Sequence, residues 1–192
     1  MAAIQTGGNM DFDRLEKNLI DMLVEQQAKL GYLSETVRLY YPLQSLNRML
    51  SSDLDCEEML LALQEFAGKA DEKFGQILIS HRGERFCFTL PPAMSDYVHE
   101  LSSADQGDRW RFIHDFVRMI SGHDCTVESL RSLFSSYSDR VCEETSDGTD
   151  FDFVFFFEDG KPDEYRYLIK AEGCHLTYHR YTPEDYEELF GG

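Results

Sequence analysis

Positive charge is scarce in this sequence. The 192 residues contain 36 aspartates and glutamates but only 18 lysines and arginines, so the formal net charge is −18 at pH 7. A chain with this balance repels phosphate backbones and anionic lipid headgroups at long range. The composition therefore predicts neither a nucleic-acid-binding protein nor a protein that binds membrane surfaces.

Long apolar runs and paired cysteines are also missing. No segment approaches the roughly 20 apolar residues that span a bilayer, and the opening stretch MAAIQTGGNMDFDRLEKN lacks the apolar region of a signal peptide. The five cysteines are widely spread and form no C-x-x-C pair, which is typical of reduced thiols in the cytosol. We therefore expect a cytoplasmic protein.

The motifs of common enzymes and cofactor sites are absent too. There is no Walker loop, G-x-G-x-x-G, G-x-S-x-G or H-E-x-x-H. Cys174, His175 and His179 do not predict a zinc site, because strand residues four apart lie about 13 Å from each other. His123 and Cys125 lie close in sequence, but a base and its thiol normally meet through the fold. The sequence favours a protein with no metal, no cofactor and no catalysis, although missing motifs do not exclude an enzyme.

Hydrophobic periodicity predicts one α+β domain over residues 10–192, after a flexible tail of residues 1–9. Its antiparallel sheet consists of a hairpin and a C-terminal four-stranded meander, with helices packed mainly on one face. Asp13 and Glu16 have capping-box spacing, Gly68 marks a helix end and Arg82-Gly83 form the hairpin turn. Thr126 with Ser129 marks a helix start, and helical spacing turns Trp110 inward. Alternation puts Val37, Leu39 and Tyr41 on one strand face. The apolar stripe of the first helix consists of Leu15, Leu19, Met22, Leu23 and Leu30. The expected helices are 13–30, 42–50, 56–69, 95–101, 108–120, 127–137 and 183–190, and the expected strands are 36–42, a hairpin within 75–92, and 139–145, 151–158, 164–172 and 175–181.

The stretch DGTDFDFVFFFEDG, residues 147–160, invites three interpretations: a calcium loop, a membrane dip or a buried strand. The spacing of its acids does not fit a calcium loop of the EF-hand type, and its apolar run is too short for a membrane. A strand covered on both faces fits best. One face would then carry Phe151, Phe153, Phe155 and Phe157.

Acidic residues accumulate from Asp139 onward, where fifteen acids stand against five bases. Such a surface keeps a protein soluble, and it also suits a basic protein partner. The first functional hypothesis is therefore a non-enzymatic binding or regulatory protein that uses this acidic surface. The residues whose neutralisation would test it are Glu143, Glu144, Asp150 and Asp152.

A second hypothesis is a site for a small anionic ligand, either in a binding protein or in an enzyme. It would form where VRLYYP, SHRGERF and TYHRY meet, because arginines bind carboxylate or phosphate through paired donors. A glutamate or histidine there would move a proton if the site is catalytic. The candidate residues are Arg38, Tyr41, His81, Arg82, Glu84, Arg85, His179 and Arg180. A third hypothesis, an acidic immunity-type or nucleic-acid-mimic protein, rests on net charge alone, and the oligomeric state is left open.

Three segments carry a family resemblance: KLGYLSETVRLYYPLQSLNRML, ISHRGERFCFTLPP and FEDGKPDEYRYLIKAEGCHLTYHRYTPEDY. Through them the chain resembles an uncharacterised bacterial family, domain of unknown function 3877, over nearly its whole length after Met10. The resemblance implies a bacterial cytosolic protein. It assigns no catalytic role to any residue.

Overall fold

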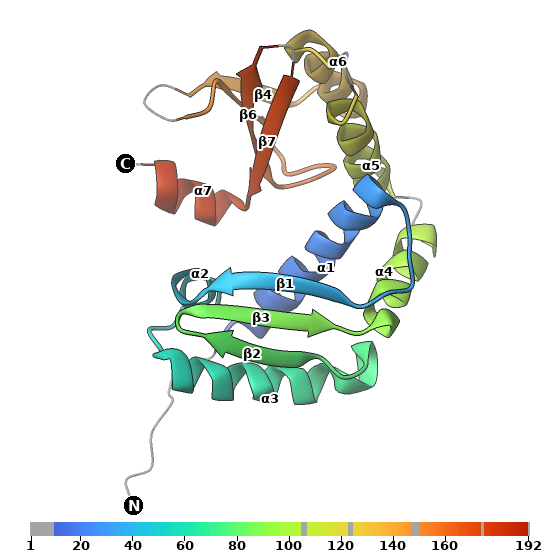
Figure 1. Ribbon diagram of the computed structural model, residues 1–192. Helices are drawn as coiled ribbons and strands as arrows, with labels where there is room; N and C mark the ends of the chain where they lie inside the picture. The colour runs from blue at the N-terminus through green and yellow to red at the C-terminus, as the bar shows by residue number, and fades with distance from the viewer. Residues whose placement is uncertain (1–9, 105–106, 123–124, 147–149, 174, 192) are drawn as a thin grey trace, which may run out of the picture. The chain divides into compact units, whose positions relative to one another are not determined.

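The computed structural model describes the chain except for residues 1–9, 105–106, 123–124, 147–149, 174 and 192 (Figure 1). The chain divides into two compact units, residues 1–104 and 105–192, and each is described by itself. Together they contain α-helices and two antiparallel sheets, which confirms the predicted α+β class. The predicted flexible tail lies outside the described residues, and the single domain over residues 10–192 stays a prediction.

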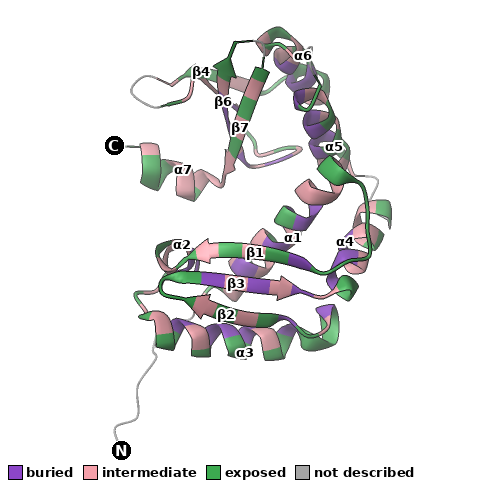
Figure 2. Ribbon diagram, viewed as in Figure 1, coloured by how far each residue is buried: buried purple, intermediate pink, exposed green. Residues whose placement is uncertain are grey.

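The first unit contains a three-stranded antiparallel sheet with the strand order β1-β3-β2. Its central strand is largely buried, while β1 and β2 expose many of their residues (Figure 2). The inward positions Phe86, Phe88 and Leu90 of β3 are fully buried. The elements of this unit are α1 (Phe12–Leu30), β1 (Val37–Pro42), α2 (Leu43–Met49), α3 (Cys56–Phe74), β2 (Leu78–Arg82), β3 (Arg85–Leu90) and α4 (Pro92–Ala104).

Helix α1 begins one residue earlier than predicted. Its N-cap is Asp11, whose carboxylate accepts a hydrogen bond from the Arg14 amide, so the expected capping box at Asp13 is wrong. Leu15, Leu19 and Leu23 form the buried stripe as predicted. Met22 and Leu30, placed on the same stripe by the sequence, are 40% and 71% exposed. Leu30 lies in the last turn of the helix.

Helix α3 continues past the predicted end at Gly68. A glycine inside a helix costs only about 1 kcal/mol relative to alanine, and burial of Ala70 and Phe74 extends the apolar stripe beyond it. The helix ends at Gly75, whose φ of 76° suits glycine. The prediction that the helix ends at Gly68 is therefore wrong, because the helix tolerates this glycine.

The hairpin turn is shifted by one residue from the prediction. Arg82 pairs with Arg85, so the two turn residues are Gly83 and Glu84 rather than Arg82 and Gly83. Gly83 adopts a φ of 58°, a conformation that is costly for a residue with a side chain. This shift decides which side chains of the hairpin share a face.

The second unit contains the predicted four-stranded meander, with the order β4-β5-β6-β7. Helices α5 and α6 cover one face of this sheet through aromatic contacts with β5, β6 and β7. On the other face, Tyr181 of β7 contacts Phe190 of α7. The elements are α5 (Asp108–Ile120), α6 (Val127–Tyr137), β4 (Val141–Thr145), β5 (Phe153–Phe157), β6 (Arg166–Glu172), β7 (His175–Tyr181) and α7 (Pro183–Phe190).

Phe112 occupies the centre of the aromatic core of the second unit. It is fully buried, and its ring contacts Phe116, Phe134, Phe157 and Tyr167 with centroid distances between 5.0 and 6.2 Å. The sequence pattern placed Trp110 on this inward face, but Trp110 is only half-buried. Aromatic pairs of this kind add roughly 0.5–1.5 kcal/mol each beyond the area they bury.

The aromatic stretch is a strand in the interior of the sheet, as predicted. Phe155 and Phe157 are buried on one face of β5, and Val154 is buried on the other. Phe151 lies outside the strand, where its ring contacts His179 at 5.3 Å, so only part of the predicted phenylalanine row exists. The expected turns at 146–150 and 173–174 lie partly outside the described residues.

Candidate binding surface

One face of the sheet in the first unit points outward and carries arginines. Successive strand residues point to opposite faces, so the positions between the buried Phe86, Phe88 and Leu90 face outward with their cross-strand partners. We name these positions the arginine face. It consists of Arg38, Tyr40 and Pro42 of β1, Leu78, Ser80 and Arg82 of β2, and Arg85, Cys87 and Thr89 of β3.

The cross-strand register arranges the arginine face in three rows. Arg38 is opposite Thr89, which is opposite Leu78. The next two rows are Tyr40, Cys87 and Ser80, and then Pro42, Arg85 and Arg82. The face thus has two positively charged ends and an uncharged middle.

The arginine face contains three bases and no acid, in a chain whose net charge is −18. Its arginines are exposed, and within the described part of the chain no ion pair involves Arg38, Arg82 or Arg85. Arg82 and Arg85 are directly opposite each other across the hairpin. Like charges in this position repel, and an anion between them would relieve the repulsion.

An open hollow of about 490 Å³ lies at this end of the sheet. The Arg85 guanidinium lies 4.8 Å from the centre of the Tyr40 ring, which is 52% exposed. A guanidinium held over an aromatic ring keeps donors free for a ligand. The hollow is lined by Tyr40, Ser80, His81, Arg82, Arg85 and Cys87.

His81 borders the hollow but is engaged by its own neighbours. Its ring stacks on Phe86 with a centroid distance of 5.0 Å, and its Nδ1 lies 3.0 Å from the Gly83 carbonyl oxygen. Its Nε2 lies 3.9 Å from a carboxylate oxygen of Glu57. The contact with Phe86 holds the ring on the sheet face that carries Phe86, opposite the arginine face.

The structure brings together four of the residues predicted for an anion site. His81, Arg82 and Arg85 line the hollow, and Arg38 lies on the same sheet face two rows away. Glu84 is exposed in the turn, and its carbonyl accepts a hydrogen bond of 2.7 Å from the Leu43 amide.

Tyr41, also a predicted site residue, faces the opposite side of the sheet. Its hydroxyl donates a hydrogen bond of 2.7 Å to Asn18, and burial raises the pKa of the hydroxyl. The sequence reasoning missed its neighbour Tyr40. The signal was available, because strand alternation places Tyr40, and not Tyr41, on the face that carries Arg38.

His179 and Arg180, the last two predicted site residues, belong to the second unit. Because they are adjacent on β7, they point to opposite faces of its sheet. Arg180 contacts Asp163, whereas His179 contacts Phe151. The meeting of TYHRY with the other two segments stays a prediction.

A buried carboxylate organises the core of the second unit, and nothing in the sequence pattern indicated it. The fully buried Asp163 accepts hydrogen bonds from Arg109 at 2.8 Å, Arg180 at 3.1 Å and the Tyr167 hydroxyl at 2.5 Å. Burial alone would raise the pKa of the Asp163 carboxyl, but the Arg180 and Arg109 guanidiniums and the Tyr167 hydroxyl together lower it. The cluster joins α5, the turn before β6, and strands β6 and β7.

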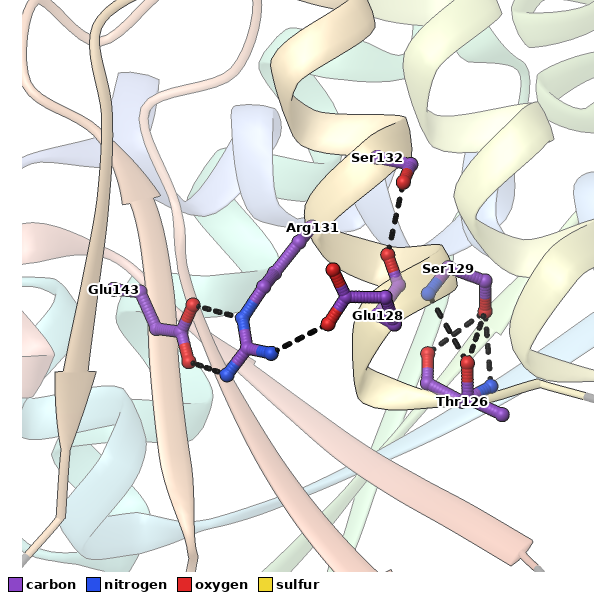
Figure 3. Close-up of polar contacts among 6 residues, drawn as sticks. All are labelled: Thr126, Glu128, Ser129, Arg131, Ser132 and Glu143. Atoms are coloured by element: carbon purple, nitrogen blue, oxygen red, sulfur yellow. Dashed lines mark hydrogen bonds and ion pairs between the residues drawn. The ribbon is translucent and has the colours of Figure 1, made fainter.

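Some acids of the predicted acidic surface form hydrogen bonds within the second unit. Figure 3 shows Arg131 reaching from α6 to Glu143 of β4, with two hydrogen bonds of 2.6 Å, and to Glu128 with one of 2.8 Å. Asp152 accepts a hydrogen bond of 2.7 Å from the Ala171 amide. Figure 3 also shows Ser129 and Thr126 capping α6, as the sequence predicts.

No group of three potential metal ligands was found among the described residues. The Cys174 and His123 positions that entered the sequence reasoning lie outside that part of the chain. None of the described helices combines the length and apolar character needed to cross a membrane.

These features define an α+β protein with an exposed, arginine-bearing sheet face. The chain belongs to the family described as "Domain of unknown function, E. rectale Gene description (DUF3877)", whose model matches residues 12–190. This match confirms the family resemblance seen in the sequence. No curated protein matches the chain, and no solved structure matches it either.

Proposed function

We propose that this chain is a non-enzymatic binding protein whose arginine face binds an anionic ligand. The observation that carries the proposal is a set of three exposed arginines that form no ion pair with any described residue, on one sheet face that holds no acid. The chain has twice as many acids as bases, so acids to pair with them are plentiful. An external anion would supply the missing partner.

The geometry around Arg82 and Arg85 suits a carboxylate or a phosphate. Guanidinium groups present paired donors that match these oxygen pairs, and such charge-assisted bonds contribute roughly 1.5–3 kcal/mol each. The two strands fix the spacing of the arginines, and Tyr40 supports one guanidinium. Binding would therefore require little reorganisation of the surface.

Binding is favoured over catalysis because every charged group on the arginine face is an arginine. Arginine stays protonated in proteins, so it binds anions but does not exchange protons. His81 is stacked on Phe86 and contacts the Gly83 carbonyl. Tyr41 faces the opposite side of the sheet, and Glu84 lies in the turn rather than on the arginine face.

A basic protein partner at the acidic surface is the weaker proposal. Two of the four acids predicted for it, Glu143 and Asp152, already hold Arg131 and the Ala171 amide. Glu144 and Asp150 remain exposed. We place the binding protein in the bacterial cytoplasm, a proposal supported by the thiols without disulfides at Cys56, Cys87, Cys125 and Cys142.

The proposal is tested by calorimetric titration of inorganic phosphate, pyrophosphate and citrate into the wild type and two double variants. The Arg82→Gln/Arg85→Gln variant is expected to bind the preferred anion about 10–100-fold more weakly, from the loss of charge-assisted hydrogen bonds. The Arg111→Gln/Arg118→Gln variant removes the same charge from α5 and should bind like the wild type. No binding of any of the three anions, or equal losses in both variants, would contradict the proposal.

A further inference from the structure

The two charged ends of the arginine face are separated by a fixed distance along the strands. Arg38 lies four strand positions from Pro42, which is opposite Arg85. At a strand rise of about 3.3 Å per residue, the two rows lie about 13 Å apart along the strand direction. The row between them, Tyr40, Cys87 and Ser80, carries no charge.

The uncharged middle restricts the ligand. The Arg85 guanidinium lies 4.8 Å from the centre of the Tyr40 ring, so a polyphosphate that ran from there to Arg38 would place negative charge over positions that hold no base of their own. Tyr40 in the middle row is 52% exposed, and Leu78 in the row of Arg38 is 55% exposed, so the uncharged positions of the arginine face offer apolar contact. The matching ligand is anionic at two points and uncharged, with apolar character, between them.

We infer that the arginine face binds an extended acidic peptide with carboxylates at positions i and i+4 and an apolar side chain at i+2. This inference rests on the proposed function and specifies its ligand. In an extended peptide these three side chains share one face, and the outer two lie about 13 Å apart. One carboxylate meets Arg38, the other meets Arg82 and Arg85, and the apolar side chain covers Tyr40.

The net charge of the protein does not prevent this contact. At physiological ionic strength, charges are screened beyond about 8 Å, so the peptide responds mainly to the charges close to it. Those on the arginine face are the three arginines. The distant acids lower the association rate but leave the local complementarity intact.

The test uses synthetic seven-residue peptides with capped ends, measured by fluorescence anisotropy. One peptide carries glutamates at i and i+4 with phenylalanine at i+2, and the matched control has the same composition with glutamates at i and i+1. The wild type is expected to bind the i, i+4 peptide about tenfold more tightly. Arg38→Gln should abolish this preference, whereas Arg82→Gln/Arg85→Gln should weaken the binding of both peptides.

The outcomes separate this inference from the proposed function. If Arg38→Gln keeps the preference for the i, i+4 peptide, or if a polyphosphate chain binds the wild type more tightly than that peptide, the inference is wrong. The proposed function then still stands as long as Arg82→Gln/Arg85→Gln weakens anion binding. If neither variant changes binding of any anion, both fail. Arg118→Gln serves as the charge control, and thermal unfolding verifies that each variant is folded.

Discussion

The carboxylate of Asp163 is the residue on which the charged core of the second unit depends. It is fully buried and holds Arg109, Arg180 and Tyr167 together. Removing one partner of a buried ion pair leaves uncompensated charge, which typically costs about 3–5 kcal/mol. The cluster therefore ties α5 to the sheet through one side chain.

Asp163→Asn is expected to lower the free energy of unfolding by about 3 kcal/mol, because Arg109 and Arg180 lose their shared negative partner. Urea denaturation followed by circular dichroism measures this. Asp159→Asn is the control, because Asp159 is exposed and its ion pair with Arg140 is long, at 3.9 Å. Equal losses in the two variants would contradict the structural role of Asp163.

The Asp163 carboxylate should also make the free energy of unfolding depend on pH. Its pKa in the folded protein lies below the ordinary value of 3.8, so the unfolded chain takes up its proton first. The stabilisation is fully present above the ordinary pKa and is lost as the pH falls through the lower, folded value. We expect the wild type to lose more stability than Asp163→Asn below about pH 4, as measured by urea denaturation across pH. Parallel pH profiles would contradict this.

Alternation along β1 shows how far single residues can be predicted. The pattern identified Val37, Leu39 and Tyr41 as one face, and the structure confirms it. The anion hypothesis nevertheless chose Tyr41, which lies on the buried face, and passed over Tyr40. Strand alternation alone separates the two tyrosines.

The helices follow local signals closely where capping residues and apolar stripes agree. Helices α5 and α6 have the predicted bounds, and Thr126 caps α6 as expected. Helix α3 departs from the prediction because tertiary burial of Ala70 and Phe74 outweighs the weak local preference of Gly68. The end of α3 at Gly75 depends on the positive φ of this residue, which the sequence does not reveal.

Two glycines of the same region are expected to respond in opposite directions. Gly68→Ala should stabilise the protein by about 0.5–1 kcal/mol, because a Cβ there meets nothing within 4 Å and alanine favours the helix. Gly75→Ala should destabilise it by about 1–2 kcal/mol, because its φ is 76°. Chemical denaturation measures both changes, and changes of the same sign would contradict this account of the end of α3.

At the scale of the whole molecule, net charge and local charge point to different ligands. The composition predicts a protein that repels anions, yet the register of one three-stranded sheet gathers three arginines on a single face. The sequence predicted the α+β class and the meander. Of the eight residues it proposed for an anion site, four lie together in the first unit. It did not predict the Asp163 cluster, because residues 109, 163, 167 and 180 meet only through the fold.

Backbone amide chemical shifts on adding pyrophosphate test the central claim most directly. If the arginine face is the binding surface, the perturbed amides will cluster in residues 38–42 and 78–89 in the wild type. These perturbations will disappear in Arg82→Gln/Arg85→Gln. Perturbations centred on residues 107–191, or the same pattern in the double variant, would contradict the claim that this sheet face binds anions.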